Sequence, residues 1–446
     1  MGLISRHFLG IIFGLVAGTL AIGQPTSQQK TSIPVLTREQ AEAKALEANY
    51  GITLQKILTT SAEVNVNRGL AGLLPTVTMG AAQTYSNNSI QQEFSNPTSP
   101  PINRSGAGTT VTTANVTLNW TLFDGMAMFV NYDRLKLMRD LEQEQGRATV
   151  ELTLAQVRLA FDNILLQNKK RALLEATLAL SKDRMALADQ RYQVGTGSKL
   201  DLLNAQVDYN TDRTALMAQE QQCTQAQADL NVLLALPSET PFIAQGDLAL
   251  KDSIIETNLA EQLKTHNNNL KLARFQREVA WQGIKLANSA RYPQLNLQAG
   301  FNYSDQSFQA GLFKRNSSYG PIIGLNATYN LFNGNRVSTN IKQAELNAHF
   351  SDVSLAQVEQ QQIASLYNAL LAYKYNRKLA KVEGENLTIA KQNTSIALDR
   401  YKVGLARPIE LREAQRNEVA NETRLLEAQF RVRASEIEIL RLVNIK

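Results

Sequence analysis

Two carboxylates hold matching positions after two similar turns. Asp201 follows the motif Arg191-Tyr-Gln-Val-Gly195, and Glu410 follows Arg400-Tyr-Lys-Val-Gly404, so the two acids lie 209 residues apart. A carboxylate in the first turn of a helix accepts hydrogen bonds from free backbone N–H groups and interacts favourably with the helix dipole. Ser198-x-x-Asp201 has the spacing of a capping arrangement, and Glu410 lies at the third position of its helix. Capping is therefore one role for these acids.

Other chemistry finds little support in the residue types. The three histidines, His7, His266 and His349, are far apart in the sequence, and the single cysteine, Cys223, has no disulfide partner and is expected in helix packing. We find no Gly-rich phosphate loop, nucleophile elbow or metal-ligand spacing. The formal net charge of +6 becomes +5 once Arg6 is removed with a signal segment, which is too mild to indicate nucleic-acid binding. The sequence therefore predicts no enzyme, no cofactor, no metal and no nucleic-acid partner.

The chain is internally duplicated. Leu122-Phe-Asp-Gly125 recurs as Leu331-Phe-Asn-Gly334, again 209 residues later. The sequence divides into a first repeat over 24–236, a linker over 237–252 and a second repeat over 253–446. Residues 1–23 have the basic start, apolar run and small residues of a secretory signal. A membrane anchor is the alternative, although the apolar run is shorter than the roughly 20 residues that a helical span needs.

Four segments alternate between apolar and polar side chains, as half-buried strands do. We expect strands over 76–85, 115–122, 296–303 and 324–331, which form one pair within 75–123 and another within 293–332. Leu118 and Trp120 share one face and Thr117 and Asn119 the other, and the last strand sets Leu325 and Tyr329 against Asn326 and Thr328. The polar faces carry Asn, Gln and Thr with almost no charge. This composition suits a transmembrane barrel, with an ordinary soluble sheet as the alternative.

Each strand pair leads into a very long helix. Asp124 and Asn333 have the residue types of N-caps, and from each of them the pattern stays helical to Tyr192 or Tyr401. About 68 residues at 1.5 Å per residue give roughly 100 Å of helix. Returning helices over 198–236 and 408–443 complete hairpins over 125–236 and 334–443, and shorter helices are expected over 37–49, 52–73 and 254–290.

Both parts of this architecture require partners. Helices of this length need other helices beside them to cover their apolar faces. Four strands also cannot close a barrel, because barrels of this kind need at least about 8. The sequence therefore predicts an oligomer that is mainly α, with a small β part.

The combined features resemble the TolC-like outer-membrane efflux proteins. The resemblance covers nearly all of the chain after residue 23, and it rests on Gly72-Leu-Leu-Pro75, Ala290-Arg-Tyr-Pro293, the two strand-to-helix steps and the paired Arg-Tyr-x-Val-Gly turns. It implies a homotrimer in which four strands per chain build one 12-stranded barrel in the outer membrane, continued by an α-helical tunnel across the periplasm. It also implies a passive exit duct of a tripartite efflux pump or a type I secretion system, fed by an inner-membrane pump through a periplasmic adaptor protein.

The resemblance further implies a gate at the end of the tunnel that carries the turns. By position its acids are Asp201, Glu410 and Glu413, and Tyr401 is the tyrosine that hydrogen-bonds in the closed state, with Asp201 as its acceptor. The base that some members of the family carry falls on Ala406 here. One carboxylate per chain becomes a ring in a trimer, which favours cations in a narrow mouth. Glu413 is the stronger gate candidate because it lies a turn inside its helix, where capping needs no acid.

The turns themselves are the expected contact with the adaptor, and the residues concerned are Tyr192, Val194, Gly195, Val403 and Gly404. We expect positive φ at both glycines. Trp120 and Tyr329 are expected to contact outer-membrane lipid, with core packing as the alternative if the sheet is soluble.

A periplasmic coiled-coil scaffold or adaptor is the competing function. An adaptor carries one helical hairpin flanked by compact β-domains, whereas two hairpins alternate with two strand pairs here. The sequence therefore favours the duct.

Overall fold

The computed structural model describes residues 33–96, 98, 100–250, 258–311 and 313–444. The signal segment predicted over 1–23 lies outside them. In chain order the elements are β1 Val35–Leu36, α1 Arg38–Ala48, α2 Tyr50–Asn65, β2 Thr76–Gln92, β3 Ile102–Phe123, α3 Ala127–Gln193, α4 Lys199–Leu233, β4 Ile243–Ala244, α5 Leu259–His266, α6 Asn268–Ser289, β5 Gln294–Phe308, β6 Arg315–Thr328, α7 Arg336–Lys402 and α8 Pro408–Val443.

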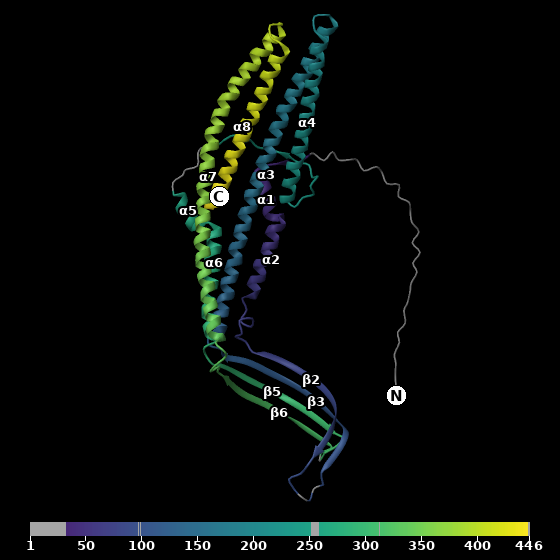
Figure 1. The fold of residues 1–446 in the computed structure, drawn as a ribbon, viewed down its shortest axis with the longest axis vertical. Coiled ribbons are helices and arrows are strands. Elements are labelled where there is room, and N and C mark those ends of the chain that lie inside the picture. The colour runs from purple at the N-terminus through teal and green to yellow at the C-terminus, as the bar shows by residue number, and fades with distance from the viewer. Residues whose placement is uncertain (1–32, 97, 99, 251–257, 312, 445–446) are drawn as a thin grey trace, which may run out of the picture.

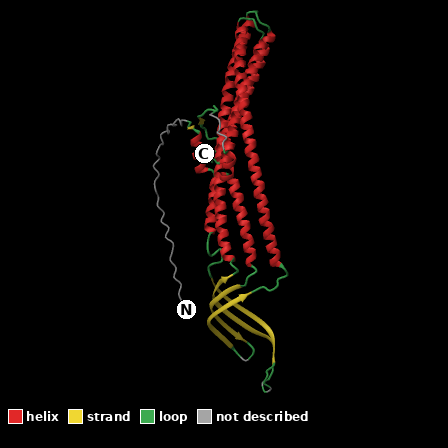
Figure 2. Ribbon diagram, turned by 90° about the vertical axis from the view of Figure 1, so that its left-hand side faces the viewer, coloured by secondary structure: helices red, strands yellow, loops and turns green. Residues whose placement is uncertain are grey.

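Two long hairpins occupy one end of the elongated chain and a curved sheet occupies the other (Figure 1). The helices α3 and α7 each contain 67 residues, which corresponds to roughly 100 Å. Both begin and end at positions 209 residues apart, and so do the starts of α4 and α8. Figure 2 shows the hairpins running side by side from the sheet to the tip. The predicted pair of very long helices with shorter returning helices is confirmed.

The N-cap prediction for the long helices is wrong by two residues. The caps are Met126 and Asn335, with φ of 74° and 63°. Each follows a glycine that also has positive φ, so the chain uses two further residues to turn out of the strand. At Gly125 the turn passes so close to α6 that a Cβ would lie 2.2 Å from the carbonyl oxygen of Ser289. The carboxylate of Asp124 still accepts a hydrogen bond, at 2.9 Å, from the backbone N–H of Met128.

Two asparagines begin the shorter helices, and the sequence prediction missed both. The segment expected as one helix over 254–290 is divided at Asn267, its residues 254–257 lie outside the described part of the chain, and the helix expected over 52–73 ends at Asn65. The side chains of Asn49 and Asn267 cap α2 and α6. Their amide groups also donate to the backbone carbonyls of Leu233 and Leu442, at 2.8 and 2.9 Å. Each asparagine therefore joins a short helix to the end of a returning helix.

The sheet has the strand order β2-β3-β5-β6, with all neighbours antiparallel. All four strands are longer than predicted, because the polar continuations beyond the alternating segments also pair. The register aligns the apolar residues into rows across the sheet, for example Val77, Leu118, Ala299 and Ile323. The predicted apolar faces therefore form one continuous apolar band, with a row containing Trp120 at one end and a row containing Tyr303 and Tyr319 at the other.

The buried interior is confined to two clusters around the hairpins. One joins α1, α3 and α4 around Val157, Phe161 and Leu230, and the other joins α5, α7 and α8 around Leu263, Tyr373 and Ile439. The fully buried Asp162 of α3 forms ion pairs with Arg38 and Arg433, which links α1 and α8 to the first hairpin. Within the described residues, no helix combines the length and the apolar character needed to cross a bilayer.

Candidate functional site at the hairpin tips

Both tip turns have the same backbone conformation. Gly195 and Gly404 have φ of 77° and 78°, so the predicted positive φ is confirmed at both. The N–H of each glycine donates to the tyrosine carbonyl at 3.1 Å, and the next N–H donates to the arginine carbonyl at 2.8 Å. This is the Schellman motif, in which glycine satisfies carbonyls that the helix leaves free. The recurring Arg-Tyr-x-Val-Gly sequence thus specifies one local structure twice.

The side chains of the two turns, in contrast, differ in their environment. The guanidinium of Arg191 lies 4.9 Å from the ring centroid of Tyr401 and donates to the carbonyl of Tyr401 at 3.2 Å. Arg400 instead donates to the carbonyl of Leu405 in its own turn, at 3.3 Å. Tyr401 is consequently buried at 4% exposure, whereas Tyr192 is 42% exposed. Arg191 therefore fastens the tip of the first hairpin to the tip of the second, which the sequence analysis did not anticipate.

The three predicted gate acids occupy the first turns of the returning helices. The backbone N–H of Asp201 donates to Ser198 Oγ at 3.0 Å, and Ser198 Oγ donates to the Asp201 carboxylate at 2.8 Å. Glu410 is exposed in the first turn of α8, and Glu413 is exposed and accepts a long hydrogen bond of 3.5 Å from Asn417. Within one chain, no hydrogen bond joins the described side chains of Asp201 and Tyr401. Their pairing, and the gate role of all three acids, stay predictions.

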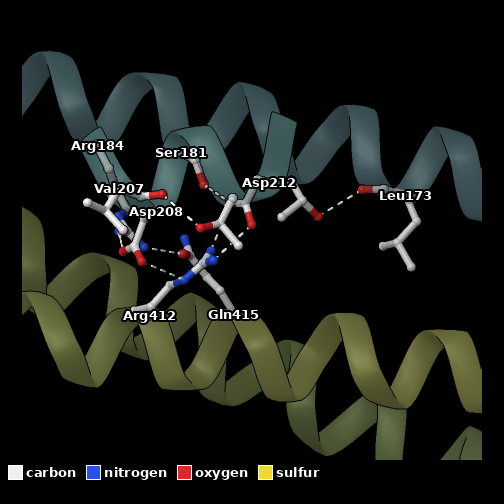
Figure 3. A network of polar contacts seen from close by, with 10 residues as sticks. Leu173, Ser181, Arg184, Val207, Asp208, Asp212, Arg412 and Gln415 are labelled. Atoms are coloured by element: carbon white, nitrogen blue, oxygen red, sulfur yellow. Dashed lines mark hydrogen bonds and ion pairs between the residues drawn. The ribbon is translucent and has the colours of Figure 1, made fainter. Parts of the chain in front are cut away.

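A polar network joins the two hairpins a few turns below the tips (Figure 3). Arg412 of α8 donates two hydrogen bonds to Asp212 of α4, both at 2.8 Å, and its Nε lies 3.3 Å from Asp208. Arg184 of α3 pairs with Asp208 and donates to Gln415 of α8 at 2.7 Å. We call these four charged residues, Arg184, Asp208, Asp212 and Arg412, the inter-hairpin clamp. Ser181 completes it by donating to Asp212.

The clamp is well shielded from water. The side chains of Arg184, Asp212 and Arg412 are 6%, 11% and 12% exposed. Burial lowers the pKa of Arg412, but hydrogen bonding to Asp212 and the charges of Asp212 and Asp208 outweigh it and raise the pKa. Arg412 therefore stays charged, and its pair with Asp212 has the two-pronged geometry that makes arginine–carboxylate pairs strong.

The charges of the clamp have no equivalents in the other repeat. At the spacing of 209 residues, Arg184 corresponds to Asn393, Asp208 to Asn417, Asp212 to Asn421 and Arg412 to Leu203. Each charged group is thus matched by a neutral one. The sequence analysis aligned the repeats only at their turns, although the same alignment extended by about 20 residues on each side would have found the clamp.

The arrangement at the tips is mechanical. Carboxylates lie in helix first turns or in ion pairs, and within the described part of the chain no group of three His, Cys, Asp or Glu side chains could hold a metal ion. The features that stand out are contacts between hairpins: Arg191 with Tyr401 at the tips, and the clamp below them. A site of this kind can hold two helical hairpins together or release them.

Comparison with known proteins agrees with this geometry. The family model described as "Outer membrane efflux protein" matches residues 42–236 and 259–444. The chain is 22% identical over 333 residues to the outer membrane efflux protein BepC of Brucella suis, which covers 74% of this chain and 72% of that protein. It is 22% identical over 347 residues to the proteases secretion protein PrtF of Dickeya chrysanthemi, with 75% and 72% covered. The match to TolC of Vibrio cholerae, at 23% identity, spans 56% of each protein.

Solved outer-membrane channels have the same fold. The Campylobacter jejuni CmeC outer membrane channel superposes with a TM-score of 0.76 at 15% identity, over 97% of this chain and 93% of that one. The outer membrane protein VceC of Vibrio cholerae superposes with a TM-score of 0.71 at 15% identity, over 91% and 95%. Because the family model spans both repeats, with their hairpins and strand pairs, the chain belongs to the outer membrane efflux protein family.

Proposed function

We propose that three copies of this channel protein share one barrel in the outer membrane, and that their hairpins form one duct through the periplasm. The observation that carries this proposal is the open sheet. Within one chain β2 pairs only with β3 and β6 only with β5, so a row of backbone groups on each outer strand is free. Lipid cannot satisfy such groups, so the edges must meet other strands. Three chains with four strands each give 12, within the range of known barrels.

The helices support the same arrangement. The helix α6 packs between α3 and α7, whereas α2 packs mainly against α3. The free side of α7 exposes large apolar residues, including Phe350 at 75% and Tyr367 at 66%. The helix α2 exposes Tyr50, Leu54 and Ile57, each at 60% or more. By the pseudo-symmetry of the repeats, α2 of a neighbouring chain covers α7 as α6 covers α3.

Native mass measurement in detergent tests the assembly. We expect a trimer whose circular dichroism shows both helix and strand. A stable monomer that retains the strand signal would contradict the proposal, because its free edges would then need no partner.

The gate follows from the difference between the repeats. In a trimer two kinds of hairpin seam alternate around the tunnel: one within each chain, which the clamp crosses, and one between chains, where the corresponding residues are Asn393, Asn417, Asn421 and Leu203. A buried and well-paired ion cluster resists separation more than neutral side chains do. Opening therefore begins at the seams between chains, and the two hairpins of one chain move together. Glu413 and Glu410 would line the opening and favour cations.

The partners would meet the duct at the tips. Val194, Val403 and Leu405 are exposed at 73%, 70% and 72%, which is more apolar surface than two short turns need for folding. We assign this surface, together with Tyr192, Gly195 and Gly404, to contact with a periplasmic adaptor that connects the duct to an inner-membrane pump. Replacing Val194 and Val403 with Asp should abolish cross-linking to the adaptor and leave the trimer intact. Unchanged cross-linking would place the contact elsewhere.

A further inference from the structure

Four cations surround the junction between sheet and helices. Arg68 lies in the turn between α2 and β2, Arg291 lies between α6 and β5, Lys285 is one turn inside the end of α6, and Arg336 is the first residue of α7. All four side chains belong to exposed residues, and none has an ion-pair partner among the residues that the structure describes. We call these four residues the junction cations.

Acidic residues are almost absent from the same zone. Residues 64–80, 282–304 and 326–344 contain no Asp or Glu. The remaining junction, where β3 leads into α3, contains Asp124, whose carboxylate accepts from the N–H of Met128. Farther along the helices, in contrast, charges of both signs alternate and pair, as Lys136 does with Asp133 and Arg277 with Asp352. The zone is therefore a band of one sign, and not a sample of the general surface.

The zone begins where the apolar band of the sheet ends. The last apolar row contains Trp120, Leu297 and Leu325, and the chain reaches the junction a few residues later. Exposed apolar side chains continue between the cations: Leu70 at 67%, Tyr292 at 57% and Phe332 at 81%. Aromatic rings beside cations at the edge of an apolar band mark the level of lipid headgroups. In an outer-membrane protein whose helices extend into the periplasm, this level is the periplasmic leaflet.

We propose that the junction cations bind the phosphate groups of anionic phospholipids in the periplasmic leaflet. The long side chains of lysine and arginine can lie along apolar surface while their charged ends meet the phosphates. Each cation near an anionic membrane surface adds to binding, and four in one chain without opposing acids select anionic over zwitterionic headgroups. This binding goes beyond the transport role, because it fixes the depth at which the barrel sits.

Lipid binding to the assembled protein in detergent tests the proposal. The probes are phosphatidylglycerol and phosphatidylcholine with identical acyl chains, and the measurement is the lipid retained in native mass spectra during a titration. The parent should retain phosphatidylglycerol in preference. The change Lys285→Gln with Arg291→Gln should weaken its binding by roughly ten- to thirty-fold, since each cation is worth about a fivefold factor.

Two further variants keep the result interpretable. Lys378→Gln with Lys381→Gln removes two exposed cations midway along α7, far from the junction, and should leave the preference unchanged. Lys285→Arg with Arg291→Lys keeps both charges and should also keep it. Equal retention of the two lipids by the parent, or equal losses in the junction and α7 variants, would overturn the proposal. The same spectra report the number of chains, so a failure of assembly is recognised separately.

Discussion

Replacing Arg412 with Leu, the residue at the equivalent position of the first repeat, is expected to loosen the closed tip. The change removes both hydrogen bonds to Asp212 and the ion pair with Asp208. It turns the seam within the chain into a copy of the seam between chains. The tip would then have no charged clamp at either kind of seam.

The magnitude follows from burial. Breaking a buried pair by removing one partner costs about 3–5 kcal/mol. Asp208 is 28% exposed and keeps Arg184 as a partner, so part of the remaining negative charge stays compensated. We therefore expect a loss of about 2–4 kcal/mol of hairpin–hairpin interaction per chain, which shifts the balance between joined and separated hairpins by roughly 30- to 900-fold.

Single-channel recording in planar bilayers measures the effect. The variant should conduct more, and stay open longer, than the parent at the same voltage. Arg431→Leu is the matched control, because it removes an exposed arginine on the same helix whose carboxylate partner Glu427 lies 3.8 Å away, a pair worth less than about 1 kcal/mol. Asp212→Asn should act like Arg412→Leu, and the double variant should add little to either change, since both break one interaction. Parental conductance combined with a lower melting temperature would show that the clamp only stabilises the fold.

Further outcomes follow from the sheet, the acids and the junction. With Cys223 changed to Ser, cysteines at Asn119 and Asn326 should react with a membrane-impermeant thiol reagent faster than cysteines at Leu118 and Leu325, and the opposite order would mean that the sheet faces are reversed. Glu413→Gln should weaken cation preference most at low salt, where screening is least, whereas Glu410→Gln should cost about 0.3–1 kcal/mol of helix stability through the dipole; unchanged selectivity in both would remove these acids from the gate. Gly125→Ala should lower the melting temperature more than its control Gly334→Ala, because both glycines have positive φ and share that backbone strain, but only a Cβ at Gly125 meets the backbone of Ser289, while one at Gly334 meets nothing within 4 Å; equal losses would show that this contact is not limiting.

Local patterns in the sequence were sufficient for much of the fold. Period-two alternation predicted which strand residues share a face, because the pleat imposes that alternation on any strand. The absence of proline and the repeated turns predicted helices of about 68 residues, against the 67 observed. The start of those helices was misjudged because Asp124 and Asn333 have the right chemistry for a cap, while the glycine after each extends the turn by two residues.

Contacts between hairpins were beyond such patterns. Arg191 meets Tyr401, and Arg412 meets Asp212, across about 200 residues of chain, so each pair depends on how two helices lie beside one another. Periodicity indicates that a helix face is covered, but it does not indicate by which residue. Asn49 and Asn267 were missed for a different reason: they lie 218 residues apart and not 209, so the repeat spacing does not align them.

The equal length of α3 and α7 limits how this protein can change. Along an α-helix each residue adds about 1.5 Å and about 100° of rotation. Losing one residue from α3 alone would lower the first tip by that distance and turn every side chain beyond the deletion away from its present neighbour. Arg191 would then miss Tyr401, and Arg184 would miss Gln415. Insertions and deletions should therefore accumulate in the strand loops and the linker, while the long helices vary by substitution and keep their count.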